Sequence, residues 1–104
     1  MTDIGNMLRL NDFSEVAAAR ARAKGFDAPS WDNMLGCLML VVAEVAEAAE
    51  ANRADDRQHF EEEIADTFIR LCDITGEMGI DIEKVILDKM AYNLTRPYKH
   101  GKRR

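Results

Sequence analysis

The sequence has few cysteines and no apolar run long enough to cross a membrane. Its two cysteines, Cys37 and Cys72, each fall within an apolar helical pattern, which favours a reducing compartment over a disulfide framework. The longest uncharged apolar stretch runs from Met34 to Ala43 and ends at Glu44, far short of the roughly 20 residues that a membrane-spanning helix needs. No secretory signal pattern precedes the first expected helix. We therefore expect a soluble, cytoplasmic protein with no membrane partner.

A continuous basic surface is also missing. The chain carries 14 Lys and Arg against 19 Asp and Glu, and five of the basic residues lie in the tail 96–104, which holds no acid. The rest of the chain keeps nine basic residues against all 19 acids, a net charge of −10. Because nucleic-acid backbones are bound by basic surfaces, we expect no nucleic-acid partner, and the basic C-terminal tail is only a small candidate site for anions. With 104 residues and no low-complexity stretch, we interpret residues 1–104 as one domain.

Strand-type alternation of apolar and polar residues does not persist anywhere, whereas helical periodicity does. Gly25 is the expected stop of the first helix, Gly76 and Gly79 of the third, and Asp81 is a good N-cap for the fourth. The expected helices cover residues 11–24, 32–52, 58–77 and 81–94.

Short connections between helices of this length predict an all-α, four-helix antiparallel bundle. The second helix is apolar almost all the way round its wheel, and three other helices of one short chain cannot cover it. We therefore expect the bundle to be completed by homo-oligomerisation, as a homodimer or a higher oligomer.

Within that apolar second helix lie Glu44 and Glu47, three residues apart, and the third helix carries Glu63 and Asp66 with the same spacing. Residues at i and i+3 share a helix face, so antiparallel helices would bring the two pairs opposite each other. Carboxylates about 5 Å apart repel by about 3 kcal/mol per pair at an effective dielectric near 20. The group needs either protonation or a hard divalent cation bound by oxygen ligands. We interpret it as a metal site.

The available ligands limit which cation would bind. His59 and His100 are the only histidines. We expect neither to lie at helical spacing from the acid pairs, so the Glu-x-x-His pattern of di-iron bundles is missing. Carboxylate ligands suit Mg²⁺, with Mn²⁺ as a substitute. The alternative is that these acids are ordinary solvated helix carboxylates, which is the interpretation we prefer for Glu50, Glu61 and Glu62.

The fourth helix offers a polar complement to the acids. Its apolar stripe continues at helical spacing into Lys89 and Asn93, and Arg96 follows just past the helix end. Beside a metal, such groups would neutralise and orient a polyphosphate, although Lys89 is equally compatible with a surface lysine and the tail with a frayed end. Trp31, the single tryptophan, is interpreted as a core anchor more than as a base-stacking platform, and it is kept among the candidate substrate contacts.

Taken in order, these residues resemble the MazG-like nucleoside triphosphate pyrophosphohydrolases of the all-α pyrophosphatase superfamily. The resemblance extends over about residues 13–102. Its motifs are Glu44-x-x-Glu47, then Glu63-x-x-Asp66, then Lys89-x-x-x-Asn93-x-x-Arg96 with the tail behind it. It implies Mg²⁺-dependent cleavage between the α and β phosphates, with the four acids as metal ligands. It also implies dimers or dimer-of-dimers tetramers that have their sites at subunit interfaces.

We therefore expect a pyrophosphohydrolase that converts (deoxy)nucleoside triphosphates to the monophosphate and pyrophosphate. Glu44 and Glu47 are the candidate catalytic residues, with Glu47 orienting or deprotonating the attacking water, and Lys99 joins the fourth-helix residues as a phosphate contact. Arg70 stands where some relatives place an aromatic base contact, so the preferred base stays open. The rivals are a related pyrophosphatase for phosphoribosyl-ATP or a deoxyuridine nucleotide, and a non-catalytic helical oligomer that regulates by binding a nucleotide or a partner.

Overall fold

A computed structural model describes residues 9–98, and within that range the chain is helical with no strand. The four helices are α1 (Leu10–Ala23), α2 (Met34–Arg53), α3 (Arg57–Glu77) and α4 (Ile82–Leu94). The expected all-α class is confirmed. Each helix begins and ends within about two residues of the position that periodicity and capping residues predict.

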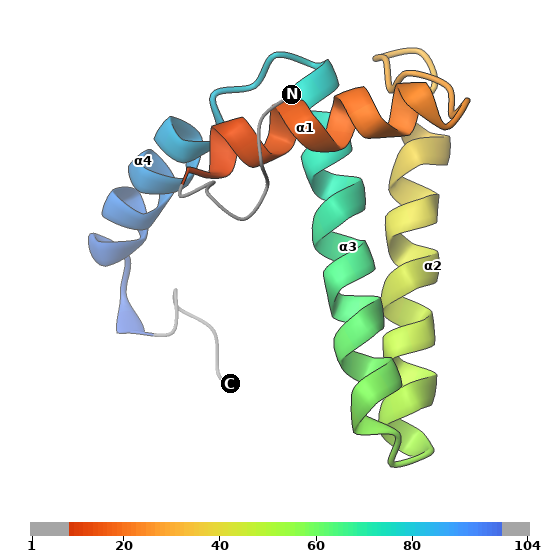
Figure 1. Cartoon of the computed structure of the whole chain (residues 1–104). Coiled ribbons are helices and arrows are strands. Elements are labelled where there is room, and N and C mark those ends of the chain that lie inside the picture. Colours follow the sequence, from red (N-terminus) through yellow and green to blue (C-terminus); the bar gives the residue numbers. More distant parts are fainter. Residues whose placement is uncertain (1–8, 99–104) are drawn as a thin grey trace.

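Helices α2 and α3 form an antiparallel hairpin, and Figure 1 shows them side by side along most of their length. The turn between them is tight because Asp55 adopts a positive φ of 57° and Asp56 caps α3 by accepting a hydrogen bond from the amide of His59. The two helices approach closely where α2 presents the buried side chains of Ala48 and Ala51. This hairpin holds both acid pairs.

Helix α1 lies across the C-terminal end of α3 (Figure 1). A Cβ on Gly76 would stand 2.2 Å from the carbonyl oxygen of Ser14, so the crossing depends on a missing side chain. The Ser14 and Thr75 hydroxyls are hydrogen-bonded at 2.8 Å beside it. The expectation that Gly76 ends the third helix is wrong, because Gly76 lies inside α3, and the reversal is made by Gly79 at a φ of +66°.

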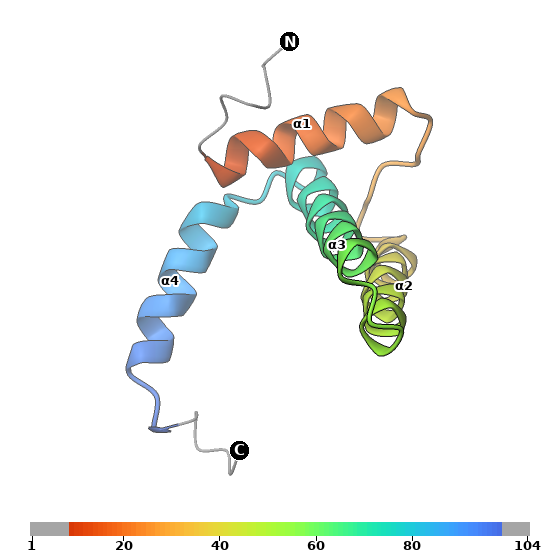
Figure 2. The ribbon, with the colours of Figure 1, turned by 60° about the horizontal axis from the view of Figure 1, so that its bottom comes forward.

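Helix α4 is fixed at its start to the start of α1. The Asn11 amide donates to Glu83 Oε2 at 2.7 Å, and the Glu83 amide donates to Asn11 Oδ1 at 3.1 Å. Asp81 accepts from the Asn11 side chain and caps α4 as predicted. From this clamp α4 leans away from the hairpin (Figure 2). The four helices therefore do not close into a bundle within one chain, and completion by oligomerisation stays a prediction.

Small residues dominate the core of the described chain, while large apolar side chains lie outside. The buried apolar residues are Ala17, Ala18, Ala48, Ala51 and Cys72. On α2, Leu35 is 80% exposed, and Met39, Val42 and Val45 are exposed as well. No helix among residues 9–98 is long and apolar enough to span a bilayer.

Candidate active site

The middle of the hairpin brings carboxylates from both helices together. Glu44 of α2 and Glu63 and Asp66 of α3 each offer an oxygen, and these oxygens lie within 4.8 Å of one another. The i,i+3 spacing within α3 puts its two acids on one face, and the antiparallel pairing of α2 turns Glu44 toward them. Three of the four predicted ligands thus meet around one space.

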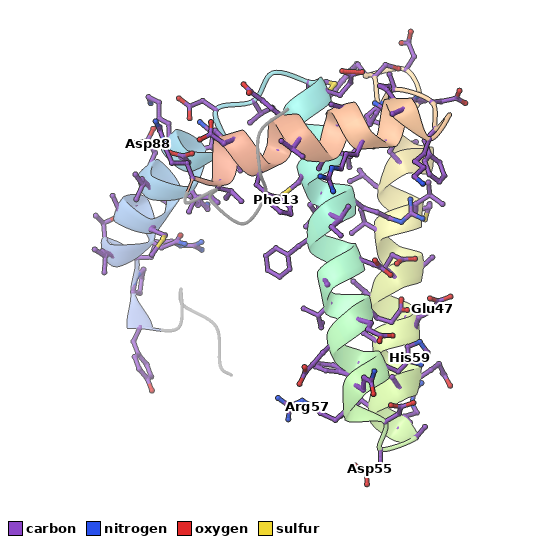
Figure 3. The ribbon with its side chains drawn as sticks, in the orientation of Figure 1. Phe13, Glu47, Asp55, Arg57, His59 and Asp88 are labelled. Carbon is purple, nitrogen blue, oxygen red and sulfur yellow. The ribbon has the colours of Figure 1, made fainter. Side chains whose placement is uncertain are left out.

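Glu47, the fourth predicted ligand, lies beside Glu63. Glu63 is 8% exposed, and its pKa is raised above the ordinary value of 4.5 by the neighbouring Glu47 carboxyl group, by burial and by the charge of Glu44. Figure 3 shows Glu47 and His59 on the same half of the hairpin. We call Glu44, Glu47, Glu63 and Asp66 the acid cluster.

Two contacts of the acid cluster were not predicted from the sequence, although the sequence places Arg70 on the same helix face. The expectation that no histidine lies at helical spacing from the acid pairs is wrong, because His59 contacts Glu63 at i,i+4. His59 precedes Glu63 by four residues, and its Nε2 lies 3.2 Å from Glu63 Oε1, a contact that opposes the rise in the Glu63 pKa. Arg70 follows Asp66 by four residues, and its Nε lies 3.7 Å from Glu44 Oε1. Both spacings place the side chains on the cluster face of α3.

The residues present fit a hard divalent cation. Every donor of the acid cluster is a carboxylate oxygen, which is the ligand type that Mg²⁺ and Mn²⁺ prefer. Glu63 Oε2 is buried and has no hydrogen-bond partner among residues 9–98, an arrangement that is costly unless something else binds the oxygen. The exposure of the neighbouring Asp66 gives an ion a route to the cluster.

A cavity of about 840 Å³ opens beside the acid cluster, between α1, α2 and α3. Glu44, Glu47 and Asp66 line one part of it, and Arg20, Lys24 and Arg70 add positive charge. The remaining wall is mostly apolar and includes Phe13, Val16, Phe26, Leu40, Ile69 and Ile74. The volume and the mixed lining suit a molecule with one charged end and one flat, apolar end.

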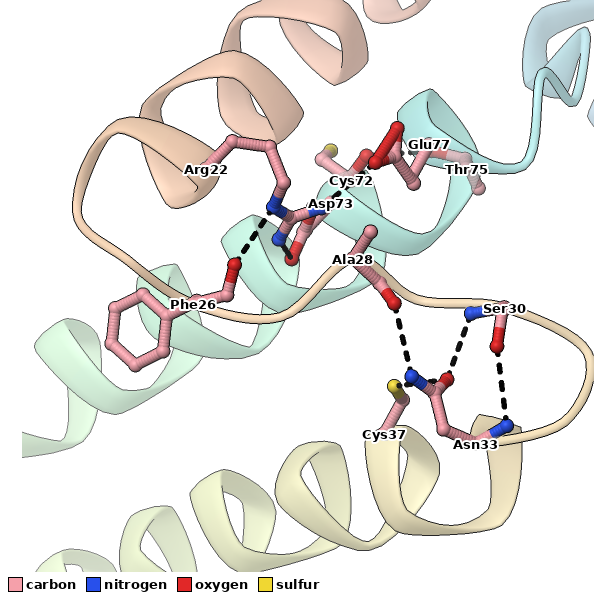
Figure 4. A network of polar contacts seen from close by, with 10 residues as sticks. All are labelled: Arg22, Phe26, Ala28, Ser30, Asn33, Cys37, Cys72, Asp73, Thr75 and Glu77. Atoms are coloured by element: carbon pink, nitrogen blue, oxygen red, sulfur yellow. Dashed lines mark hydrogen bonds and ion pairs between the residues drawn. The ribbon is translucent and has the colours of Figure 1, made fainter.

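Two polar networks fix the loop that closes this cavity (Figure 4). Arg22 donates to the Phe26 carbonyl at 3.0 Å, to Asp73 at 2.9 Å and to Glu77 at 3.2 Å. Asn33 accepts from the Ser30 amide and donates to the Ala28 carbonyl. The loop between α1 and α2 is thereby tied to α3 at one end and to the start of α2 at the other.

The predicted phosphate-binding residues of α4 and of the segment just after it do not reach the acid cluster within one chain. The Lys89 ammonium lies 5.0 Å from the centre of the Tyr92 ring, and the Arg96 guanidinium lies 5.9 Å from it. Asn93 Oδ1 is buried without a hydrogen-bond partner in the described chain. No α4 residue lines the cavity. Lys99 lies outside the described residues.

Trp31 is 82% exposed in the turn that precedes α2. Its interpretation as a core anchor is therefore wrong for the single chain, because the ring buries little surface. Trp31 is also not among the residues that line the cavity. Trp31 could contact a substrate only if the nucleotide extended past the cavity rim, or if the substrate were bound by a second subunit.

A comparison with models of protein families identifies the family of this chain. The family model described as the MazG nucleotide pyrophosphohydrolase domain matches residues 33–96. The chain belongs to the MazG family. The match includes the whole acid cluster of this MazG domain together with Lys89, Asn93 and Arg96. Comparisons with curated proteins and with solved structures found no significant match. MazG membership supports a nucleotide pyrophosphohydrolase, that is, a hydrolase acting on acid anhydrides.

Proposed function

We propose that the chain hydrolyses nucleoside triphosphates, with Mg²⁺ as cofactor, to the monophosphate and pyrophosphate. The geometry of the acid cluster carries the proposal. Glu44, Glu63 and Asp66 present oxygens within 4.8 Å of one another, one Glu63 oxygen has no partner, and the group opens into a cavity of nucleotide size. Mn²⁺ would fit the same oxygen ligands.

The acids have separate roles in this proposal. Glu44, Glu63 and Asp66 hold the cation, which when bound supplies Lewis-acid polarisation of the phosphates and a more acidic water. Glu47 lies next to Glu63 and also lines the cavity. From there its carboxylate orients the attacking water and accepts its proton. Glu44 is the residue that can support both functions, since it is one of the proposed metal ligands and also lines the cavity.

The cavity separates the two ends of a nucleotide. The triphosphate lies near the acid cluster, where a metal and cationic side chains offset its charge. The base and sugar lie against the apolar wall that Phe13, Phe26 and Leu40 help to form. Burying a flat apolar ring there removes it from water, and the loop that carries Phe26 is held in place by the Arg22 and Asn33 networks.

A second copy would complete the site. Lys89 and Asn93 lie on α4, and Arg96 follows its end. Helix α4 leans away from the acid cluster of its own chain (Figure 2), while apolar side chains of α2 remain uncovered. A homodimer, or a tetramer built from two dimers, would cover α2 and deliver α4 to the partner's cavity.

Subunit complementation tests this arrangement. Asp66→Asn and the double variant Lys89→Ala/Arg96→Ala are each expected to be nearly inactive alone. If the site is shared between subunits, a co-purified mixed dimer should recover roughly half of the parental turnover, because one of its two sites is intact. If the mixed dimer is no more active than the average of the two variant homodimers, both sets of residues act within one chain.

The reaction itself is tested with a panel of the common ribo- and deoxyribonucleoside triphosphates in the presence of Mg²⁺. Pyrophosphate should appear together with the monophosphate. Release of orthophosphate as the first product would contradict the assigned cleavage site. Nucleotide binding without any hydrolysis would favour the regulatory role instead, and cleavage confined to phosphoribosyl-ATP or a deoxyuridine nucleotide would assign the related pyrophosphatase.

A further inference from the structure

Two arginines beside the cavity are held in different ways. Arg22 makes three hydrogen bonds, to the Phe26 carbonyl, Asp73 and Glu77. Arg70 makes one ion pair, with Glu44, at an N–O distance of 3.7 Å, which is longer than a hydrogen bond. Arg22 is thus locked in place, whereas Arg70 is held to the acid cluster by charge alone.

The position of Arg70 is unusual for a purely structural cation. Its side chain is 35% exposed and lines the cavity, while its partner Glu44 is 14% exposed and belongs to the predicted metal ligands. A guanidinium offers five donors in a planar fork, and those of Arg70 make no hydrogen bond within residues 9–98. Arg70 therefore faces the cavity with unused donors.

A divalent cation and Arg70 compete for the same carboxylate. Glu44 Oε1 is paired with the guanidinium, yet a Glu44 oxygen is also one of the three that converge on the predicted ion. A cation bound there would take the negative charge that holds Arg70 and would repel the guanidinium. Arg70 would then need another anion, and the cavity that its side chain lines can hold one.

We propose that Arg70 is the internal counterion of the acid cluster in the metal-free protein and becomes a phosphate ligand when the metal binds. The inference rests on the proposed function, because the anion it identifies is the phosphate chain of the nucleotide. A guanidinium binds phosphate oxygens in a bidentate manner, and it remains charged at every physiological pH. The exchange couples metal binding to nucleotide binding through one side chain, without any movement of the helices.

The first experiment measures metal affinity without nucleotide, by calorimetric titration of the metal-free protein with Mn²⁺. Arg70→Ala should bind Mn²⁺ about fivefold more tightly than the parent, since the competing positive charge is gone. Arg70→Lys, which keeps the charge, should bind Mn²⁺ like the parent. Arg57→Ala is the matched control. It removes an arginine from the same helix that pairs with Glu61, outside the acid cluster, and it should leave Mn²⁺ affinity unchanged.

The second experiment measures the affinity for an α,β-imido deoxynucleoside triphosphate, which cannot be cleaved at the assigned bond. With Mn²⁺ present, Arg70→Ala should bind this analogue about tenfold more weakly than the parent, and Arg70→Lys should fall between them. Without metal, parent and Arg70→Ala should bind it alike, because Glu44 occupies the guanidinium. The loss of metal-dependent tightening is a readout that a merely structural arginine would not give.

Unchanged Mn²⁺ affinity in Arg70→Ala would overturn the counterion half of the inference, even in a fully active enzyme. Equal metal-dependent tightening of the analogue in parent and Arg70→Ala would overturn the phosphate half. Failure of the proposed function is distinguishable from both, since it would appear as a parent that cleaves no triphosphate. Circular dichroism spectra should match between parent and variants, because Arg70 makes no hydrogen bond within residues 9–98. Without metal, however, Arg70→Ala should melt at a lower temperature than the parent, since the acid cluster has lost its counterion, and saturating Mn²⁺ should reduce that difference.

Discussion

The two halves of α3 differ in their contribution to stability. Its last turns pack under α1, where Gly76 admits the Ser14 backbone and Asp73 accepts from Arg22. Its first half carries Glu63 and Asp66 into a group of acids that repel one another. One half lowers the free energy of the fold and the other raises it.

The difference indicates where function lies. A helix whose only task was to pack would place apolar or paired residues along its whole length, as binary patterning requires. Here the charge conflict is confined to one region, and that region opens into the cavity. Sites that raise the free energy of the fold are retained when a ligand relieves the conflict, and the ligand expected here is a cation.

The largest expected effect comes from the first half of α3 and its partner helix. Glu47→Gln and Asp66→Asn should each reduce turnover by at least about a hundredfold, the scale of losing a general base or a metal ligand. The metal-free variants should be as stable as the parent or more so, because one repelling charge is removed. Steady-state kinetics and thermal melts with and without Mg²⁺ would check both statements.

In these melts the parent should gain more stability from Mg²⁺ than either variant, since stabilisation by a ligand follows its affinity. Parent-like turnover in both variants would remove the metal-site hypothesis.

The other half of α3 should respond to Gly76→Ala with a loss of about 2 to 3 kcal/mol in the free energy of unfolding, because the new methyl group overlaps the Ser14 carbonyl oxygen. Gly36→Ala is the matched control. A Cβ at Gly36 meets nothing within 4 Å, so alanine should stabilise α2 by about 1 kcal/mol. Urea unfolding measures both changes. Equal effects at the two glycines would show that the α1–α3 crossing tolerates a side chain.

The pH dependence of stability separates the acid cluster from the α1–α4 clamp. The pKa of Glu63 is raised by Glu47 and by burial, so folding binds protons there. The metal-free protein should lose stability as the pH rises from the ordinary value of 4.5 through the folded pKa of Glu63. The pKa values of Asp81 and Glu83 are lowered by hydrogen bonds from Asn11, so their contribution should be lost as the pH falls.

Glu63→Gln isolates the first of these effects. Its stability relative to the parent should increase with pH in urea titrations without metal, and saturating Mg²⁺ should reduce that difference. A pH-independent difference between variant and parent would mean that Glu63 titrates normally.

The smallest effect is expected far from α3. Removing the residues after Tyr98 should reduce turnover less than about threefold, because charges on the tail are screened over about 8 Å at physiological salt. Lys89→Ala and Arg96→Ala should each reduce turnover more, by about tenfold. A larger loss on truncation than on Lys89→Ala would place the polyphosphate against the tail.

Much of this arrangement could be predicted from sequence because it is local. Apolar spacing predicts the helices, and the i,i+3 acids on two neighbouring helices predict the cluster. His59 and Arg70 carried an equally local i,i+4 signal. Their importance depends on the burial of Glu63 and on the pairing with Glu44, which only the packed hairpin defines.

The rest depends on contacts between residues distant in sequence. The direction of α4 is set by Asn11 and Glu83, 72 residues apart, and no periodicity encodes that pair. Gly76 looks like a helix stop until α1 is known to cross it. Trp31 looks like a core residue until the loop places it outside. Local patterns report which face of a helix is apolar, but not which surface will cover it.

The bonds between Asn11 and Glu83 have a thermodynamic consequence for assembly. Ordering a free segment of chain on association costs about 1 to 2 kcal/mol of backbone entropy per residue. Because α4 is already helical and already anchored at its start in the single chain, that entropy is lost during folding and not at the encounter between subunits. Helix α4 is therefore preorganised, and a second subunit that bound it in the proposed dimer would lose little of the interaction energy to ordering this segment.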